Sequence, residues 1–350
     1  MRLTSLILLL LLGSCKKDKV SFPSSETQLE NGMVVLCEGL FQQNNSSVSW
    51  IDFSNSEISN SFFLDNTQRQ LGDTGNDVQQ YGNKIYIVVN VSSTIEVLDA
   101  NDFSSLKQIP MIANSVSKQP RNITFHEGKA FVTCYDGFVD VIDTNLLEVT
   151  KRIAVGSNPE GLAVVNNKLY VSNSGGLNSG PMDSTVSIIN LGTELEEEKI
   201  RVGLNPGQVI SDADGDVYVA IRGDYASISS SLTRIDSQTD LVIQELPIEV
   251  NSIVEMNGKF LLSYYDFNTS MSSVKVFDPT VELIENSSLI NDPNITTLYG
   301  ISYSASLDKI FVLDAMNFIN TGYVRKYSSN GAWEKDYHVG LNPTKVLFYE

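Results

Sequence analysis

Few residues of this sequence are of the types that catalyse reactions or bind metals. The chain has two histidines, His126 and His338, which leaves little for zinc binding or for acid–base chemistry by imidazole. The segment 212–216 (Asp-Ala-Asp-Gly-Asp) carries alternate acids, as calcium loops do, but its glycine precedes the third acid and position twelve is Gly223. A plain turn is the better interpretation. The sequence contains no Gly-rich phosphate loop, nucleophile elbow or Cys-x-x-Cys pair.

Residues suited to binding are more numerous and fall into two groups. The first group comes from segments that we interpret as long loops, 39–47, 174–184, 222–231, 264–273 and 315–322. Its candidates are Phe41, Gln42, Arg222, Tyr225, Tyr264, Tyr265 and Phe318, with Phe267 and Met316 beside them. The second group comes from short joints and strand ends, and consists of Asp73, Arg121, Tyr135, Glu160, Gln208 and Tyr299. Aromatic faces beside amides and a few charges suit a large, flat, amide-bearing ligand, although some of these residues are expected to be structural.

A repeated strand motif predicts the scaffold that positions these residues. A turn followed by an apolar strand recurs at intervals of 39 to 51 residues, which is close to the period of propeller blades. The seven copies begin with Gly32-Met33-Val34, Gly82-Asn83-Lys84-Ile85, Gly128-Lys129-Ala130-Phe131, Asn167-Lys168-Leu169-Tyr170, Gly215-Asp216-Val217-Tyr218, Gly258-Lys259-Phe260 and Asp308-Lys309-Ile310-Phe311.

A second strand follows each copy and ends in an acid or its substitute. Its alternation of β-branched and polar residues is typical of a strand with one buried face. The terminal residues are Asp52, Asp99, Asp143, Asn190, Asp236, Asp278 and Ser328. Because turn residues follow them, we interpret these side chains as turn caps and not as catalytic groups or metal ligands.

Asn-Pro joints such as 155–161 (Val-Gly-Ser-Asn-Pro-Glu-Gly) connect the repeats, so each unit has four antiparallel strands. The sequence therefore predicts an all-β fold, a seven-bladed β-propeller. The first unit lacks its innermost strand, whereas the last residues form such a strand without a blade, so we expect the C-terminal strand to complete blade one. Cys37 and Cys134 fall in blades one and three, too far apart for a disulfide, and are predicted to be buried free thiols.

The N-terminus predicts export and a lipid anchor. Arg2, the apolar run 6–12 and the small residues Gly13 and Ser14 have the order of a secretory signal peptide. Cys15 follows directly, and this ending resembles the lipobox of bacterial lipoproteins, in which the cysteine is acylated and becomes the first mature residue. The predicted organisation is a lipoprotein signal peptide at 1–14, a lipidated cysteine with a flexible tether at 15–28, and a single propeller at 29–350.

The charge of the chain limits its partners. A formal net charge of −18 without a basic block disfavours nucleic acid and anionic membrane surfaces, so membrane contact is expected through the anchor only.

The repeat motifs resemble a known group, the YncE-like seven-bladed propellers, which include surface lipoproteins of Bacteroidota. The resemblance is carried by the joint 155–161, the segment 168–176 (Lys-Leu-Tyr-Val-Ser-Asn-Ser-Gly-Gly), the strand 186–190, Leu71-Gly72-Asp73-Thr74 and Tyr135-Asp136-Gly137. It is closest to the BtuG-type lipoproteins, which capture cobalamin and other corrinoids on a TonB-dependent outer-membrane transporter. The resemblance implies cell-surface exposure at the outer membrane, a corrinoid as bound ligand, and no cofactor or metal.

Alternative functions remain open at this stage. An oligosaccharide would also suit the aromatic and amide residues, and a glycan- or protein-binding scaffold is compatible with the same features. A metal-dependent propeller enzyme of the lactonase or lyase type would need carboxylates that converge near the channel, for which Asp73, Glu160 and Asp314 are candidates.

Overall fold

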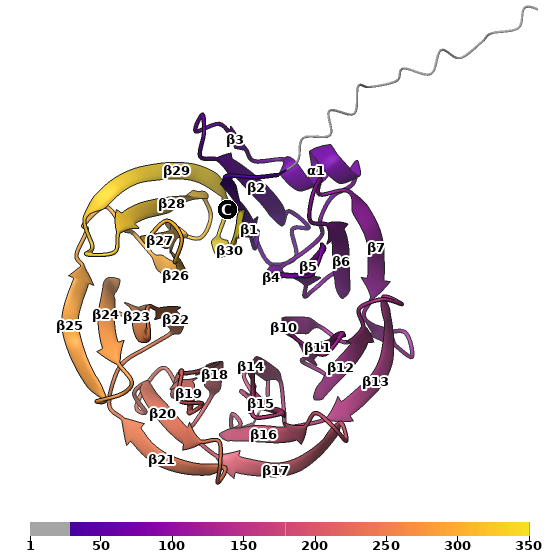
Figure 1. The fold of residues 1–350 in the computed structure, drawn as a ribbon, viewed down its shortest axis with the longest axis vertical. Coiled ribbons are helices and arrows are strands. Elements are labelled where there is room, and N and C mark those ends of the chain that lie inside the picture. Colours follow the sequence, from indigo (N-terminus) through magenta and orange to yellow (C-terminus); the bar gives the residue numbers. More distant parts are fainter. Residues whose placement is uncertain (1–28, 179, 350) are drawn as a thin grey trace, which may run out of the picture.

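The computed structural model of the protein describes residues 29–178 and 180–349, and these residues form a ring of seven four-stranded antiparallel sheets (Figure 1). The predicted signal peptide, Cys15 and the tether lie outside the described residues. Within the described part, no helix is both long and apolar enough to cross a membrane.

We name the strands of each blade A to D from the channel outward. Blade one combines both ends of the described chain: β30 (Pro343–Tyr349), β1 (Gly32–Cys37), β2 (Ser47–Asp52) and β3 (Ile58–Ser59). Blade two is β4 (Gly75–Tyr81), β5 (Lys84–Val89), β6 (Thr94–Asp99) and β7 (Ser105–Pro110). Blade three is β10 (Pro120–His126), β11 (Lys129–Cys134), β12 (Phe138–Asp143) and β13 (Glu148–Ala154). Blade four is β14 (Pro159–Val165), β15 (Lys168–Asn173), β16 (Thr185–Asn190) and β17 (Leu195–Arg201).

The remaining blades repeat the same order. Blade five is β18 (Pro206–Ser211), β19 (Val217–Ile221), β20 (Ser231–Asp236) and β21 (Leu241–Leu246). Blade six is β22 (Ser252–Met256), β23 (Lys259–Asp266), β24 (Met271–Asp278) and β25 (Leu283–Ile290). Blade seven is β26 (Leu298–Ser304), β27 (Lys309–Asp314), β28 (Thr321–Ser328) and β29 (Trp333–Leu341). Two additions were not predicted from the sequence: helix α1 (Phe62–Thr67) and the small hairpin of β8 (Ile112–Ala113) and β9 (Val116–Ser117).

The ring closes as predicted. β30 pairs antiparallel with β1, with Val34 opposite Leu347 and Val35 opposite Val346, so the end of the chain supplies the inner strand of the first blade. In Figure 1 the yellow β30 accordingly lies beside the indigo β1. Without β30 the inner edge of β1 would be unpaired, and the pairing of the two strands removes this exposed sheet edge.

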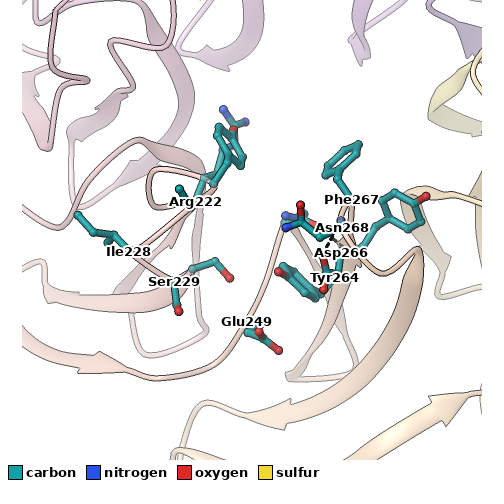
Figure 2. A pocket seen from close by; sticks show the side chains of 13 residues that line it. Arg222, Ile228, Ser229, Glu249, Tyr264, Asp266, Phe267 and Asn268 are labelled. Carbon is teal, nitrogen blue, oxygen red and sulfur yellow. Dashed lines mark hydrogen bonds between the residues drawn. The ribbon is translucent and has the colours of Figure 1, made fainter.

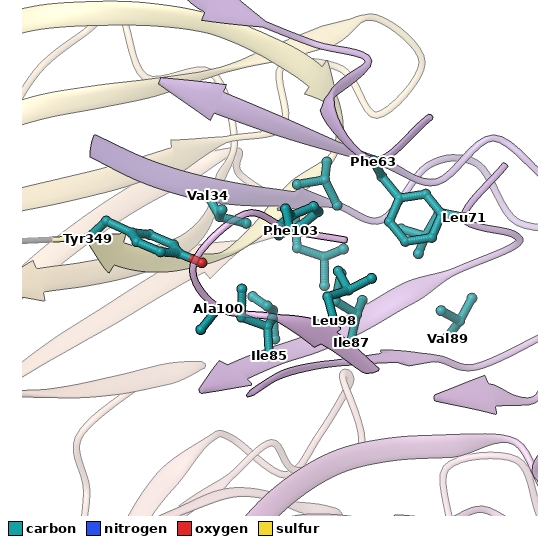
Figure 3. Close-up of a cluster of buried hydrophobic side chains, with 13 residues drawn as sticks. Val34, Phe63, Leu71, Ile85, Ile87, Val89, Leu98, Ala100, Phe103 and Tyr349 are labelled. Carbon is teal, nitrogen blue, oxygen red and sulfur yellow. The ribbon is translucent and has the colours of Figure 1, made fainter. Parts of the chain in front are cut away.

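The hydrophobic core is divided among the interfaces between blades. B strands are buried on both faces, as the run 33–37 in β1 illustrates, because each blade is covered by its two neighbours. Figure 3 shows the cluster between blades one and two, which contains Val34 from blade one and Ile85, Ile87 and Leu98 from blade two. The helix α1 contributes Phe63 to the same cluster and closes its outer end.

The terminal residues of the C strands cap their turns, as the sequence predicted. Oδ1 of Asp52, Asp143 and Asp236 each accepts the main-chain N–H two residues further on, at 2.7–2.8 Å. Asp99, Asn190 and Asp278 make the same contact. The segment 212–216 is also a turn, in which Asp212 accepts the N–H groups of Asp214 and Asp216. Cys37 and Cys134 are buried free thiols, as predicted.

Ring closure is directly testable. Deletion of residues 344–350 removes most of β30 and leaves the inner edge of β1 unpaired, so we expect the midpoint of thermal unfolding to fall by more than about 10 °C. Lys345→Ala, which keeps the strand, is the matched control and should melt close to the wild type. A truncated protein that melts at the wild-type temperature would show that the ring does not depend on this strand.

Candidate functional site

A local irregularity at the start of the A strands builds the candidate site. In six blades the register between the A and B strands shifts at this end, as it does between Pro120 and Ile123 in blade three. A β-bulge changes the direction in which the side chain of its extra residue points. The bulged positions form an inner ring at one mouth of the channel, consisting of Asn76, Arg121, Glu160, Gly207, Tyr299 and Thr344.

The Asn-Pro joints tie the following loops to this ring. Asn158, Asn205 and Asn342 have φ values of 44°, 57° and 53°, a left-handed conformation that asparagine tolerates better than most residues. Their carbonyl groups accept the main-chain N–H of Ser174, Arg222 and Glu38 respectively. Gln119, which precedes Pro120, accepts the main-chain N–H of Tyr135 in the same way. The first residue after a B strand is thereby held beside the inner ring, which explains why Glu38, Tyr135 and Arg222 reach it.

Glu160 is the centre of a buried ionic network. Its side chain is 5% exposed and contacts two arginines: Nε of Arg121 lies 3.2 Å from Oε2, and Nη1 of Arg222 lies 3.4 Å from Oε1. The hydroxyl of Tyr135 donates a hydrogen bond to the same carboxylate. Arg121 also donates to Asn76 at 2.8 Å, and its guanidinium lies 4.7 Å from the centre of the Tyr135 ring.

The electrostatics of this network follow from burial and from charge pairing. Burial opposes the ionisation of Glu160, but Arg121, Arg222 and the Tyr135 hydroxyl together hold the pKa of this carboxyl at about 2. Glu38 differs, because burial raises its pKa despite the hydrogen bond that it accepts from Tyr299. Burial and the neighbouring Glu160 raise the pKa of Tyr135, so its phenol stays protonated and acts as a donor.

A cavity of about 420 Å³ opens next to the network, between the B–C loops of blades five and six (Figure 2). Four predicted residues line it: Arg222, Tyr225, Tyr264 and Tyr265. Phe267 and Glu249 contribute to its wall as well. Its volume is in the range of small-molecule sites.

A row of aromatic rings in contact extends from this cavity to the inner ring at the channel mouth. Tyr265 packs edge-on against Phe267 at 5.0 Å between ring centres, and Phe267 stacks on Phe318 at 6.2 Å. Phe318 contacts Tyr299 at 5.6 Å, and Tyr299 donates to Glu38. Tyr225 and Phe318 have φ values of 58° and 65°, which bulky residues rarely adopt, so the loops hold these rings at a conformational cost.

We call the side of the ring that carries the B–C loops and the joints between blades the loop face. Three predicted residues on it differ from those around the cavity, because two bind main-chain groups and the third is largely exposed to solvent. Asp73 is buried and accepts the main-chain N–H groups of Gln42 and Asn44, so it shapes the loop that contains Phe41 and Gln42. The amide of Gln208 bonds both main-chain groups of Ile253 and joins blades five and six. Phe41 is 67% exposed.

The three carboxylates considered for an enzyme are in separate networks. Asp314 accepts the N–H groups of Thr296 and Thr297 and pairs with Arg325 at 2.9 Å, whereas Asp73 and Glu160 have the partners described above. Residues 29–178 and 180–349 contain no group of three or more His, Cys, Asp or Glu side chains that could hold a metal ion.

Sequence reasoning missed Glu38, Asn76, Gly207 and Glu249. The first three occupy the position after a B strand or the bulged position of an A strand. An alignment of the seven repeats would have shown these residues at the same two positions as Arg121, Glu160 and Arg222. Glu249 precedes β22, where no repeat motif marks the position.

The fold defines the protein as a seven-bladed β-propeller whose candidate site is a cavity next to the channel mouth. Comparison of its sequence with protein families shows to which family it belongs. Residues 31–260 match the family described as a domain of unknown function, DUF5074, and the chain belongs to this family. No curated protein matches the sequence.

Solved structures share the fold at low sequence identity. A quinoprotein alcohol dehydrogenase-like protein from Bacteroides thetaiotaomicron is 12% identical with a TM-score of 0.67, covering 92% of this chain and 79% of that one. A 6-phosphogluconolactonase candidate from Bacteroides fragilis is 11% identical with a TM-score of 0.64, covering 94% and 100%. Hydrazine synthase from Kuenenia stuttgartiensis is 15% identical with a TM-score of 0.57, covering 70% and 73%. At these identities the likeness concerns the fold alone.

The ionic network predicts a specific dependence of stability on pH. Because the folded-state pKa of Glu160, about 2, lies below its unfolded value, its contribution to the free energy of unfolding is present above about pH 4.5 and lost as the pH falls toward 2. Glu160→Gln should therefore lower the free energy of unfolding at pH 7 by on the order of 3 kcal/mol and weaken its decline on acidification. Urea unfolding at pH 7, 5 and 3 measures both effects.

The control for this prediction is Glu148→Gln, which alters an exposed glutamate on β13. It should leave the pH profile of the wild type unchanged. Parallel pH profiles for the wild type and Glu160→Gln would contradict the assigned role of this carboxylate.

Proposed function

We propose that this protein is a lipid-anchored binding protein that captures a corrinoid on its loop face and passes it to a TonB-dependent outer-membrane transporter. The proposal for the ligand rests on the loop face, and the proposals for anchor and transporter rest on Cys15 and on the sequence resemblance. Binding without turnover is proposed because the face offers rings and hydrogen-bonding groups around a cavity, whereas Glu160 and Asp314 are paired with arginines and Asp73 with main-chain donors.

The observation that carries the proposal is the continuity between the cavity and the channel mouth. Arg222 belongs to both, since it lines the cavity and contacts Glu160. The rings of Tyr265, Phe267, Phe318 and Tyr299 provide apolar faces along the same path. A ligand larger than the cavity could lie across this path with its flat part on the rings and its amides on the polar groups.

Binding is tested by isothermal titration of the full-length protein with cyanocobalamin and with cobinamide. We expect one-to-one, submicromolar binding of cyanocobalamin. Tyr264→Ala and Tyr299→Ala should each weaken it by roughly tenfold, because Tyr264 lines the cavity and Tyr299 supplies a ring of the path. Tyr303→Ala, which changes a tyrosine bonded to Asn257 and Asp308, is the matched control. No heat and no spectral change with either corrinoid would exclude this ligand class and make glycans the next candidates.

The anchor is tested separately with Cys15→Ser. The variant lacks the thiol to which a lipid would be attached, so we expect it to move from the membrane fraction to the soluble fraction. The intact mass of the wild type should exceed that of the mature peptide by the mass of its acyl groups. A wild-type protein with an unmodified Cys15 would refute the anchor without bearing on the ligand.

A further inference from the structure

The cavity between blades five and six has an unusual arrangement of charge. Arg222 and Glu249 both line it, and Figure 2 shows them at different ends, with Tyr264 next to Glu249 and Phe267 across from Arg222. Asp266 lines the cavity too, but its carboxylate accepts the N–H of Asn268 at 2.8 Å and the hydroxyl of Thr269 at 2.8 Å within its own turn. The two ends of the cavity therefore differ in the sign of their charge.

Arg222 has more hydrogen-bond donors than partners. Its guanidinium carries five N–H groups, yet within the described residues its side chain makes one hydrogen bond, the 3.4 Å contact to Glu160. Arg121 contrasts with it, since Glu160, Asn76 and the Tyr135 ring engage its guanidinium from several sides. Glu160 thus fixes Arg121 firmly and Arg222 weakly, and the Arg222 side chain is 26% exposed.

The position of Arg222 depends on Gly207. At the bulged position where blades three and four have Arg121 and Glu160, blade five has Gly207. A Cβ atom at residue 207 would lie 2.7 Å from Nε and 2.9 Å from Cζ of Arg222, so the guanidinium lies against the bare main chain. The absence of a side chain here makes room for the arginine at the boundary between the channel mouth and the cavity.

We infer that Arg222 binds an oxyanion of the ligand, a phosphate or carboxylate group adjacent to a flat ring, while Glu249 receives hydrogen-bond donors at the other end of the cavity. A guanidinium pairs with such groups in a planar, two-point geometry, and partial burial strengthens the contact. Tyr225 and Tyr264 supply the faces on which the ring would stack. The inference rests on the proposed function in using the same cavity, but it does not require that the ligand be a corrinoid.

The test uses three small probes of similar size on the full-length protein: phenyl phosphate, benzoate and uncharged benzyl alcohol. Ligand-observed NMR titration should show that at least one of the two anions binds roughly tenfold more tightly than the alcohol. Which anion binds better identifies the phosphate or the carboxylate as the preferred group. Arg222→Gln should abolish the preference for an anion and leave the binding of the alcohol unchanged.

Two further variants separate charge from fold. Arg201→Gln changes an exposed arginine at the end of β17, outside the cavity, and should keep the preference. Gly207→Ala retains the charge of Arg222 but displaces its guanidinium, and should weaken the anion selectively. Unchanged thermal melting confirms that each variant is folded. A wild type that does not prefer either anion, or an Arg222→Gln variant that keeps the preference, overturns the inference.

Corrinoids distinguish this inference from the proposed function. Cyanocobalamin carries a phosphodiester that cobinamide lacks, so the wild type should bind cyanocobalamin more tightly and Arg222→Gln should remove the difference. If neither corrinoid binds but the anionic probes bind through Arg222, the proposed ligand is wrong and the oxyanion site stands. If both corrinoids bind equally and Arg222→Gln changes neither them nor the probes, the oxyanion site is wrong and corrinoid capture stands.

Discussion

Burial of the B strands between neighbouring blades is the constraint on which the rest of this structure depends. Each blade is a sheet only four strands wide, and it hides its apolar faces only when a second sheet lies on either side. The first blade meets this condition through β30, which arrives from the far end of the sequence and pairs with β1. A ring has no terminal blade, so every interface can be apolar, and the clusters between blades follow from closure and not from any single contact.

Closure also divides the molecule into a part that must repeat and a part that is free to vary. The B strands and the capping acids recur because each blade has the same neighbours and the same turns. The bulged residue of the A strand is not constrained in this way, because it is unpaired in the register between the A and B strands. It is an arginine in blade three, a glutamate in blade four and a glycine in blade five. Variation at this one position gives the channel mouth of a nearly symmetric scaffold a different side chain in each of these blades.

The sequence was sufficient to predict the fold, the closing strand, the turn caps and the free thiols, because each depends on a repeated pattern or on the position of a residue within it. It was less informative about the site. Asp73 and Gln208 have residue types that suit ligands, yet their partners are main-chain groups, at positions that only the folded loops define. Helix α1 was not predicted because a helix of six residues is too short to show a clear hydrophobic periodicity.

The ionic network shows how neighbouring blades share one charge balance. Glu160 from blade four neutralises Arg121 from blade three while remaining within reach of Arg222 from blade five. One carboxylate between two guanidinium groups does not engage both equally, and the second acid of this region, Glu38, accepts a hydrogen bond from Tyr299 instead. The guanidinium that is held less firmly is that of Arg222, which lies beside the cavity. In the proposed site, blades three and four hold the ion pair of Arg121 and Glu160 in place, and the guanidinium of Arg222 from blade five is left available to a ligand.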